Sequence, residues 1–544
     1  MVRDLASLAS TRFDTVIVGG GVYGLATAWE LASRGVSVAL VERGDFAGAT
    51  SFNSLKTVHG GIRALQHGAL GEMREFVRER RAIAMMAPHL VRPLPFIVPT
   101  YRHPVRNRLA MGLFFATYDR LSADRNAGVD PSRALPRSRT VGRAECLRLN
   151  PAIDPDGVTG GAIWHDYQMH SPERFALALL QSAVDSGAAV ANYVEATALL
   201  IENGRVQGLR VLDRPTGTPF DIRATTVVNA AGPWARRLPG PASLRRPRWS
   251  VAMNLVFDRA PLPHAVGGMA AGRFLFMVPW RNRSIVGTSH DEHVEPGDAD
   301  PLGAADPPER LALAPHLIEA FLRDAQAAFP GGALGPDQIT LVHRGLLPAG
   351  AGRGTLLKRS IVHDHGSDGL AGLLTVVGVR YTTARATAQR AAHCIGIMLG
   401  RTLPASATAR RTLAGGDIPN VARYEREQCA ASALPLDQVV RLIATYGTGH
   451  VAVASLIRAD PALGAPLSAT CAVTRAEILY AARHEMALHL ADALLRRTHA
   501  GAGGHPGAPA VESAADVMAT ELGWTAGQRA TEVEAVDEFY TRPA

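Results

Sequence analysis

The stretch 13-FDTVIVGGGVYGLATAWELASRGVSVALVERGD-45 decides the fold class of this chain. An apolar run that ends in glycines predicts a strand, and apolar residues at near-helical spacing then predict a helix that ends at Gly35. A second apolar run ends at Glu42 and predicts another strand. A strand, a helix and a strand in this order form a βαβ unit, which opens a doubly wound α/β sheet.

The turn between the first strand and the helix has the spacing of a dinucleotide-binding motif. Gly19 permits the tight turn, Gly21 lets the backbone approach a pyrophosphate, and Gly24 lets the helix pack closely on the strand. The N-terminus of the helix offers N–H groups to the phosphates. Glu42 follows where a ribose-binding carboxylate is expected. The alternative is a glycine-rich turn with a surface glutamate, but the combined pattern favours dinucleotide binding.

Two further segments favour FAD over NAD as the dinucleotide. "ATSFNSLKTVHGG" (49–61) directly follows the second strand and is rich in hydroxyl groups and short side chains, which suit the many contacts of a permanently bound flavin. "TVVNAAGPWA" (226–235) ends in small residues, which let the backbone approach a cofactor. The cofactor contacts expected in these segments are Thr50, Ser51, Ser54 and Gly232.

Length and composition indicate an ordinary globular chain of more than one domain. The 544 residues exceed one core, so two or three domains are expected. The four cysteines form no CxxC motif, which fits a reducing compartment and indicates neither a disulfide framework nor a cysteine zinc site. We expect no bound metal. The net charge of +8 favours an anionic partner, either a phosphorylated substrate or an acidic membrane surface.

The sequence predicts neither export nor a membrane span. Residues 1–14 lack an apolar core of signal-peptide length, and no apolar run approaches the ~18 residues of a spanning helix. Nucleic-acid binding is not expected, because basic residues are not interleaved with aromatic residues on one face. We therefore expect a cytoplasmic protein.

Later segments return to the first sheet from distant parts of the chain. Further strands are predicted at 204–213, 224–235, 274–280, 283–290 and 372–378, and a helix at 381–399. This order indicates a nucleotide-binding domain interrupted by a substrate domain. The predicted division is an FAD-binding region with an interleaved substrate domain over 12–400, a linker over 401–419 and a helical domain over 420–544.

Two segments of the helical domain need separate interpretation, because one resembles a metal-binding motif and the other has the composition of a loop. "HEMALH" (484–489) resembles a zinc-protease motif, but HExxH needs a histidine where Leu488 stands, so we expect part of one long helix over 474–498. "HAGAGGHPGAPA" (499–510) predicts a flexible loop by composition.

The loop "SLKTVHGGIRALQHG" (54–68) holds the residues with the most obvious chemistry. His59 and Arg63 lie on either side of two adjacent glycines. They could act as a base and an anion clamp, or they could belong to an ordinary loop.

Nine segments in order over about 500 residues make the chain resemble the FAD-dependent glycerol-3-phosphate dehydrogenases, within the D-amino-acid-oxidase-like flavoproteins. The segments are VIVGGGVYGLATAWELASRG, ATSFNSLKTVHGGIRALQHG, MAPHLVRPLPFIVP, GLFFATYDRL, VVNAAGPWA, VPWRNRSIVGTSH, VGVRYTTARATAQRAA, ATYG and RHEMALHLADALLRRT. The resemblance implies a Rossmann-like FAD-binding domain, an inserted antiparallel-sheet substrate domain and a helical C-terminal domain.

The resemblance also implies roles for individual residues. In the family this loop reaches over the flavin, so His59 would face the carbinol hydroxyl as a general base and Arg63 would hold the substrate phosphate. Arg380 stands where the family has a lysine and keeps a positive charge near the flavin. Gly378 and Thr382 are expected beside the cofactor in the same segment.

The pocket departs from the family pattern at two positions. Ala64 stands where the family has a tyrosine, and Leu347 where it has an arginine; Arg344 is an alternative source of that charge. The leading hypothesis is oxidation of sn-glycerol 3-phosphate to dihydroxyacetone phosphate, with electrons passed to a quinone or similar acceptor. A related enzyme for another hydroxy or amino compound is the alternative. A flavin-binding protein without turnover is a third hypothesis.

One segment raises the question of membrane contact. "RHPVRNRLAMGLFFATYDRL" (102–121) places basic residues before an apolar, aromatic stretch, which suits either an interfacial membrane element or a buried helix under a basic loop. Because the family delivers electrons to a membrane quinone, the resemblance implies peripheral contact with the cytoplasmic face of the inner membrane. A homodimer is an open alternative to a monomer.

Overall fold

Close backbone contacts determine how strand β1 (Arg12–Val18) meets helix α2 (Val22–Ala32). In this computed structural model, a Cβ atom on Gly24 would lie 1.9 Å from the carbonyl oxygen of Gly19. One on Gly19 would lie 2.6 Å from the carbonyl oxygen of Ala230, and Gly19 also has a φ of +108°. Both positions therefore require glycine, which is the packing reason for the predicted motif.

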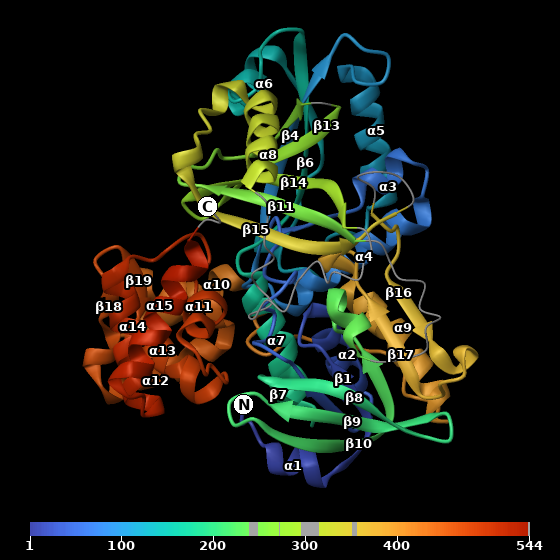
Figure 1. The fold of residues 1–544 in the computed structure, drawn as a ribbon. Coiled ribbons are helices and arrows are strands. Elements are labelled where there is room, and N and C mark those ends of the chain that lie inside the picture. Colours follow the sequence, from blue (N-terminus) through green and yellow to red (C-terminus); the bar gives the residue numbers. More distant parts are fainter. Residues whose placement is uncertain (239–248, 271, 295–314, 351–355, 542–544) are drawn as a thin grey trace.

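Three parts make up the molecule (Figure 1): one sheet with helices at the bottom, a second sheet at the top, and a helical C-terminal part at the left. The structure describes residues 1–238, 249–270, 272–294, 315–350 and 356–541. The first sheet is built from segments far apart in the chain, as the sequence predicts.

The first sheet has the strand order β16-β17-β10-β1-β2-β7, and β9 and β8 extend it from β10. Strands β17, β10, β1, β2 and β7 pair in parallel, so their carboxyl ends meet at one edge. Its further strands are β2 (Val38–Val41), β7 (Ala189–Ala191), β8 (Val194–Glu202), β9 (Arg205–Asp213), β10 (Thr218–Asn229), β16 (Ile361–Asp364) and β17 (Leu373–Val377). Its helices besides α2 are α1 (Leu5–Ser10), α7 (Pro172–Asp185) and α9 (Ala384–Met398).

The second sheet has the order β15-β11-β14-β13-β12-β4-β6-β3, with β5 paired to β6. Its pairs are antiparallel except for β12 with β4. The strands are β3 (Thr57–Val58), β4 (Val91–Tyr101), β5 (Arg139–Gly142), β6 (Val158–Met169), β11 (Trp249–Phe257), β12 (Ala265–Ala270), β13 (Arg273–Trp280), β14 (Arg283–Val294) and β15 (Ile339–Pro348). The helices of this part are α3 (Ile62–Gln66), α4 (Leu70–Met86), α5 (Arg108–Leu121), α6 (Arg143–Leu149) and α8 (Pro315–Ala328). The predicted α/β fold with an inserted, largely antiparallel sheet is confirmed.

The C-terminal part is helical, as the sequence predicts. Its elements are α10 (Val421–Ala431), α11 (Leu436–Tyr446), α12 (His450–Ala459), β18 (Pro466–Ser468), β19 (Cys471–Thr474), α13 (Arg475–His484), a π-helix (Asp492–Arg497), α14 (Ala508–Leu522) and α15 (Ala526–Tyr540). The preceding segment 401–419 forms neither helix nor strand, but it packs through buried Leu413, whose N–H donates to the carbonyl of Met86 at 2.9 Å. The domain limits at 400 and 420 stay a prediction.

The single long helix predicted over 474–498 is wrong. Helix α13 ends at His484, and the next helical segment begins at Asp492. The Asp492 carboxylate accepts hydrogen bonds from the N–H groups of Leu488 and His489, both at 3.0 Å. This cap competes with helical backbone bonds, so the chain turns between the two helices.

The segment 499–510 packs against its neighbours, contrary to the flexible loop predicted from its composition. The hydroxyl of Tyr540 donates to the carbonyl of Gly501 at 2.6 Å, and that of Thr340 donates to the carbonyl of Gly503 at 2.7 Å. A Cβ atom on Gly501 would lie 2.3 Å from the Tyr540 hydroxyl oxygen. Glycine here allows close packing.

One helical stretch meets the length and composition of a membrane span, which the sequence analysis did not anticipate. Leu436–Ala459 has a mean hydropathy of 1.3 over its most apolar window, and half of that window is buried in the protein. Gly447, with a φ of +57°, interrupts the stretch between α11 and α12. Its apolar side chains pack within the C-terminal part, as the core helices of a helical domain do.

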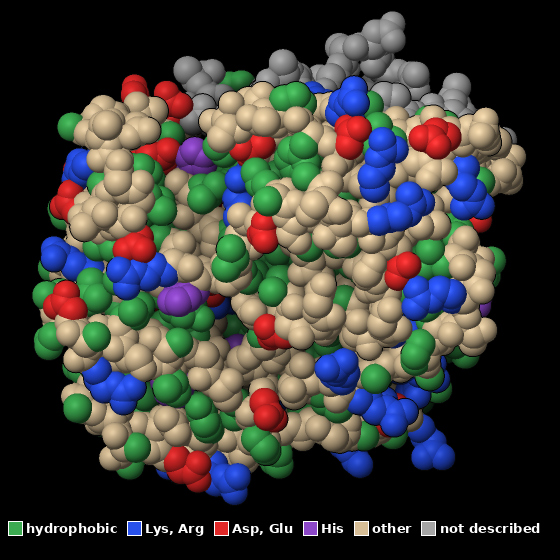
Figure 2. Space-filling model, turned by 90° about the horizontal axis from the view of Figure 1, so that it is seen from below, with side chains coloured by type: hydrophobic (Ala, Val, Ile, Leu, Met, Phe, Trp, Pro, Cys, Tyr) green, Lys and Arg blue, Asp and Glu red, His purple; other side chains and the backbone are tan. Residues whose placement is uncertain are grey.

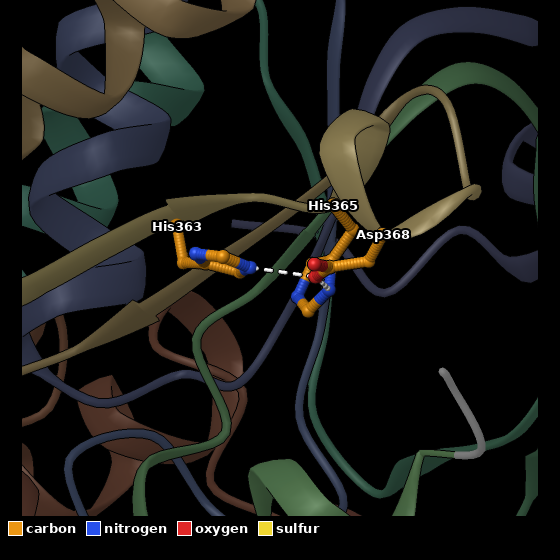
Figure 3. Close-up of side chains that lie close together, drawn as sticks. All are labelled: His363, His365 and Asp368. Atoms are coloured by element: carbon orange, nitrogen blue, oxygen red, sulfur yellow. Dashed lines mark hydrogen bonds and ion pairs between the residues drawn. The ribbon is translucent and has the colours of Figure 1, made fainter. Parts of the chain in front are cut away.

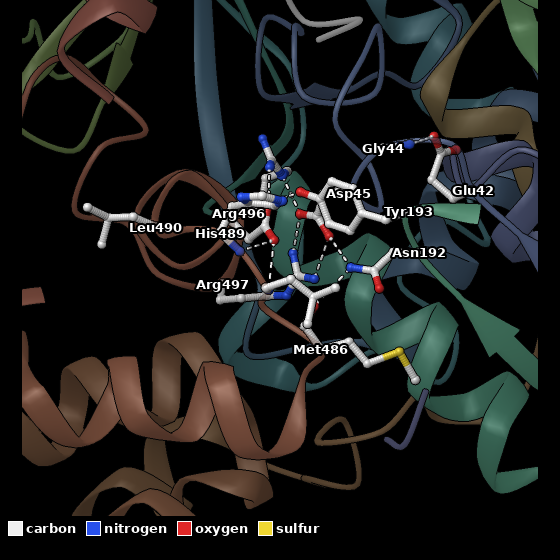
Figure 4. A network of polar contacts seen from close by, with 12 residues as sticks. Glu42, Gly44, Asp45, Asn192, Tyr193, Met486, His489, Leu490, Arg496 and Arg497 are labelled. Atoms are coloured by element: carbon white, nitrogen blue, oxygen red, sulfur yellow. Dashed lines mark hydrogen bonds and ion pairs between the residues drawn. The ribbon is translucent and has the colours of Figure 1, made fainter. Parts of the chain in front are cut away.

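Asp45 joins the C-terminal part to the first sheet (Figure 4). Its carboxylate accepts two hydrogen bonds from Arg497, at 2.5 and 2.6 Å, and one from Arg496 at 2.5 Å. Burial raises the pKa of Asp45, but Arg497 and Arg496 outweigh it and hold that pKa well below its usual range. The three side chains are buried, so each charge depends on the others.

We expect Asp45→Asn to lower the free energy of unfolding by about 3–5 kcal/mol, because buried Arg497 loses its counter-ion and buried Arg496 loses one while it keeps Asp492. Chemical denaturation with saturating FAD would measure it. Since the folded-state pKa is depressed, the carboxylate contributes its full stabilisation above its unfolded pKa of about 3.9 and loses it progressively as the pH falls from there toward the lower folded-state pKa. The gap between the two proteins should therefore shrink at acid pH.

Glu521→Gln provides the control for this prediction. Glu521 pairs with Arg483 at 2.7 Å on the surface of the same C-terminal part. Its loss should cost about 1 kcal/mol or less. Equal effects of the two substitutions would contradict a special role for Asp45.

Candidate functional site

A cavity of about 1440 Å³ is lined by residues from both large sheets. Among its lining residues are all predicted site residues except Gly24, which packs beneath it against Gly19. The predicted residues that line the cavity are Gly19, Gly21, Glu42, Thr50, Ser51, Ser54, His59, Arg63, Gly232, Gly378, Arg380 and Thr382. The structure thus brings both predicted groups of residues, for cofactor and for substrate, to one space.

The cofactor end of the cavity is built from the carboxyl edge of the first sheet. Helix α2 begins there with Gly21 as its N-cap, so the positive end of the helix dipole lies at the cavity wall. A Cβ atom on Gly21 would lie 3.2 Å from Ser51 Oγ, so Ser51 would have to move to make room for a side chain at this turn. Glu42 follows β2 and is held by the N–H groups of Gly20 (2.6 Å) and Gly44 (2.9 Å). These residues fit a dinucleotide cofactor.

Buried polar contacts hold the loop that carries His59. The N–H of Gly60 donates to Asp166 at 2.7 Å, and its carbonyl accepts from the Tyr118 hydroxyl at 3.0 Å. Arg80 donates to the same oxygen of Asp166. A Cβ atom on Gly60 would lie 2.0 Å from the Tyr118 oxygen and 2.2 Å from Arg80 Nη1. This position therefore needs glycine to pass between the two side chains.

The next glycine starts the short helix that carries Arg63. Gly61 is the N-cap of α3 and has a φ of +77°, a conformation that favours glycine. A Cβ atom there would lie 2.8 Å from the Cβ of Phe76. The two adjacent glycines thus serve packing and turn geometry, and they place His59 and Arg63 on the cavity wall.

His59 faces the cavity and is surrounded by charged groups. Its Nε2 lies 3.0 Å from the hydroxyl oxygen of Thr57, and its backbone N–H donates to the hydroxyl of Thr382 at 3.3 Å. Burial lowers its pKa below 6.5, Asp166 opposes that shift, and Arg63, Arg380 and Arg80 add to it. His59 is therefore neutral near pH 7 and can accept a proton.

The two cavity arginines of the prediction differ in their partners. Arg380 donates to Glu72 at 2.5 Å and to the carbonyl of Lys358 at 2.9 Å. Arg63 forms no hydrogen bond or ion pair with any residue in the described ranges. Burial and Arg380 lower the pKa of Arg63, but a guanidinium remains charged. Arg63 thus offers an uncompensated positive charge to the cavity.

His290 adds an unused hydrogen-bonding group near Arg63. Its Nδ1 is buried and has no partner among the described residues. Burial lowers its pKa to about 4, and Arg63 and Arg273 contribute. Within the described residues, a buried polar atom without a partner and a nearby guanidinium without a partner are what a site for a polar, anionic ligand presents before it is filled. The sequence analysis missed His290, which lies at the end of a predicted strand.

The departures from the family pattern are visible in the cavity. Ala64 and Leu347 both line it. Arg344 is not among the described lining residues, and its backbone N–H donates to Asn53 at 3.1 Å. The position of Arg344 therefore does not support the hypothesis that it supplies the positive charge that the family has at the position of Leu347.

Tyr23 and Asp166 are structural parts of the site that sequence reasoning missed. The Tyr23 hydroxyl accepts from the N–H groups of Val379 and Arg380, both at 3.1 Å, and donates to the carbonyl of Arg380 at 2.7 Å. A Cβ atom on Gly378 would lie 1.9 Å from the Tyr23 ring. Tyr23 occupies a variable position of the glycine motif, which the motif does not single out, whereas Asp166 is the only acidic residue in β6.

On the face seen in Figure 2, Lys and Arg side chains lie interspersed with Asp and Glu side chains. The described part of this face therefore carries no continuous basic surface of the kind that binds nucleic acids. The positive charge relevant to a ligand lies inside the cavity.

Comparison with known proteins follows the same division of the chain. Residues 14–393 match the family described as FAD dependent oxidoreductase, and residues 406–529 match the C-terminal domain of alpha-glycerophosphate oxidase. Glycerol-3-phosphate dehydrogenase 2 of Mycobacterium tuberculosis is 32% identical over 97% of this chain and 88% of its own. Glycerol-3-phosphate dehydrogenase of Synechocystis sp. is 26% identical over 99% and 98% of the two chains.

A solved structure shares the fold. The glycerol-3-phosphate dehydrogenase from Bacillus halodurans complexed with FAD superposes with a TM-score of 0.77 at 23% identity, over 98% of this chain and 96% of that one. The predicted family and cofactor are confirmed, while the roles of individual site residues stay a prediction. The chain belongs to the FAD dependent oxidoreductase family, and its cofactor is FAD.

Proposed function

We propose that the protein oxidises sn-glycerol 3-phosphate to dihydroxyacetone phosphate. The observation that carries this is Arg63, a guanidinium without a partner among the described residues, in the same cavity as the dinucleotide-binding turn. A phosphate monoester matches such a group in charge and in hydrogen-bonding geometry. Relatives named glycerol-3-phosphate dehydrogenases, up to 32% identical over nearly the whole chain, support the same substrate.

His59 and Arg63 divide the work on this substrate. FAD, when bound, supplies the acceptor for the hydride that leaves C2. His59 takes the proton of the C2 hydroxyl, for which its lowered pKa keeps a free lone pair at neutral pH. Arg63 holds the phosphate, and Asp166 keeps the loop between them in place through Gly60. Loss of the hydride from C2 and of the proton from the hydroxyl, which together are two electrons and two protons, converts the alcohol into the ketone.

A different substrate remains the second candidate, and Ala64 and Leu347 favour it. Both are apolar lining residues where the resembled family has polar ones. Anaerobic mixing of the FAD-loaded protein with sn-glycerol 3-phosphate, glycerol and a panel of amino acids separates the candidates. Bleaching of the flavin by sn-glycerol 3-phosphate alone supports the proposal. Bleaching by an unphosphorylated compound alone would overturn it.

We further propose a membrane quinone as the electron acceptor, reached at the cytoplasmic face of the inner membrane. An apolar part of the cavity leads toward α5, which supports this. Its lining residues there are Val98, Met111, Phe115, Met269 and Phe274. The outer face of α5 exposes Leu109 (86%) and Leu113 (72%), and Arg106 and Arg108 lie exposed beside them. Apolar side chains flanked by cations suit an anionic lipid surface.

Arg63→Ala should raise the KM for sn-glycerol 3-phosphate by about 10- to 100-fold and change kcat little. The reason is that a charge-assisted contact of about 1.5–3 kcal/mol made in both ground and transition states acts chiefly on KM. Steady-state kinetics would measure it. Arg63→Lys should restore part of the affinity that Arg63→Ala loses. Arg102→Ala, a change at a surface arginine, should leave the KM at its wild-type value. An unchanged KM in Arg63→Ala would contradict phosphate binding at this residue.

His59→Ala should slow flavin reduction at saturating substrate by about 10²- to 10⁴-fold, because proton removal belongs to the chemical step. Stopped-flow absorbance under anaerobic conditions would measure it. Thr57→Val, which removes only the neighbour of His59 Nε2, serves as the matched control and should slow the step far less. Equal rates in wild type and His59→Ala would exclude His59 as the base.

Leu109→Glu combined with Leu113→Glu should release the protein from vesicles that contain anionic lipid, since two charges replace the exposed apolar face of α5. Sedimentation with vesicles would measure the bound fraction. Ile397→Glu, at an exposed apolar residue on α9, should leave binding unchanged. All variants should retain turnover with a water-soluble electron acceptor, which shows that they are folded. If the double variant still binds vesicles as the wild type does, α5 is not the membrane contact.

A further inference from the structure

Three potential metal ligands meet at the edge of the first sheet, outside the cavity described above. His363 lies on the edge strand β16, and His365 and Asp368 lie in the 3-10 turn that follows it. One ligand atom from each lies within 4.8 Å of the other two (Figure 3). The three residues are also close in the sequence, because the spacing HxHxxD places them within six consecutive residues.

The two imidazole rings converge on one carboxylate oxygen. His363 Nε2 lies 2.6 Å from Asp368 Oδ2, and His365 Nδ1 lies 2.9 Å from the same atom. The ligand atoms around a four-coordinate zinc ion lie somewhat farther from one another than these nitrogen and oxygen atoms do, because each bond from a ligand atom to the zinc is about 2.0–2.2 Å long. Small rotations of the exposed His363 ring would open that space, since 37% of its side chain is accessible.

Thr375 orients the buried member of the group. Its hydroxyl oxygen lies 2.9 Å from His365 Nε2, on the far side of the ring from Asp368. When a neutral His365 donates Nε2–H to this hydroxyl, Nδ1 carries a lone pair that faces the carboxylate, and a metal ion or a proton between the two atoms makes the contact favourable. Metal-bound histidines have this arrangement, with the second ring nitrogen bonded to a polar group of the surrounding protein.

We propose that His363, His365 and Asp368 bind a divalent transition-metal ion of the zinc class. Two imidazole nitrogens and one carboxylate oxygen are the donors such ions prefer, and water completes the coordination. His363 is open to solvent and His365 is buried, so the ion would enter from the surface and rest against the sheet. The site is separate from the oxidation chemistry, because none of the three residues lines the described cavity wall.

The ion would fasten β16 to β17 at the start of the segment that leads to Arg380. His363 is paired with Thr375 across the two strands, and β17 runs from Leu373 directly to Gly378 at the cavity. A metal here would stabilise the hairpin rather than take part in substrate oxidation. The alternative is a metal-free cluster in which both rings donate hydrogen bonds to Asp368.

Metal titration of the untagged, FAD-loaded protein after chelator treatment tests the proposal. We expect isothermal titration calorimetry to detect one equivalent of Zn²⁺ and the melting temperature to rise with Zn²⁺. Co²⁺ should give the visible absorption of a four- or five-coordinate site. His363→Gln and Asp368→Asn should each weaken Zn²⁺ binding by at least about tenfold, and Thr375→Val by about 10- to 100-fold.

His505→Gln is the matched control, because His505 also pairs with a carboxylate, Asp537, at 2.9 Å but belongs to no metal-ligand group among the described residues. It should bind Zn²⁺ as the wild type does. Flavin absorbance of each variant reports whether it folds. A folded wild type that takes up no Zn²⁺, or a folded His363→Gln that binds it equally well, would overturn the proposal in favour of the metal-free cluster.

Discussion

One buried carboxylate, that of Asp166, joins the elements that form the substrate end of the cavity. It accepts hydrogen bonds from the backbone of Gly60, from Arg80 on α4 and from the indole of Trp164 on its own strand. Because the group is buried, loss of any one partner leaves a charge or a polar atom unsatisfied, which costs far more than a surface contact. The position of His59 thus depends on a pairing made between β6, α4 and the loop.

Local pattern accounts for the parts of the fold that the sequence predicts well. The glycine turn, the first helix and its flanking strands depend on neighbours within about thirty residues, and their periodicity is visible in the chain. The break between α13 and Asp492, and the packed segment 499–510, depend on side chains from other elements. Composition predicted a helix and a flexible loop there, because it does not report a cap by Asp492 or a partner such as Tyr540.

The site residues also divide into those that a local sequence pattern reveals and those that depend on contacts between distant segments. His59 and Arg63 could be predicted because their loop has a recognisable spacing and a family resemblance. Tyr23 could not, since its hydroxyl meets the backbone near Arg380 only when chain segments more than 350 residues apart come together. The pairing of Arg380 with Glu72 was equally hidden, and it changes the interpretation: the positive charge predicted near the flavin already has a counter-ion.

The residues that contact the cofactor end, the C-terminal part and the substrate end of the cavity lie close together in the sequence, and this couples the three parts. Residues 42–63 supply the carboxylate at the cofactor end, the ion pair with the C-terminal part through Asp45, the hydroxyls beside the dinucleotide turn, and finally His59 and Arg63. Asp45 also lines the cavity. Because the carboxylate that holds Arg496 and Arg497 lies three residues after Glu42, a shift of the C-terminal helices would move the cofactor end of the site. The helical part is therefore a structural support of the flavin site, although its own residues carry none of the chemistry proposed above.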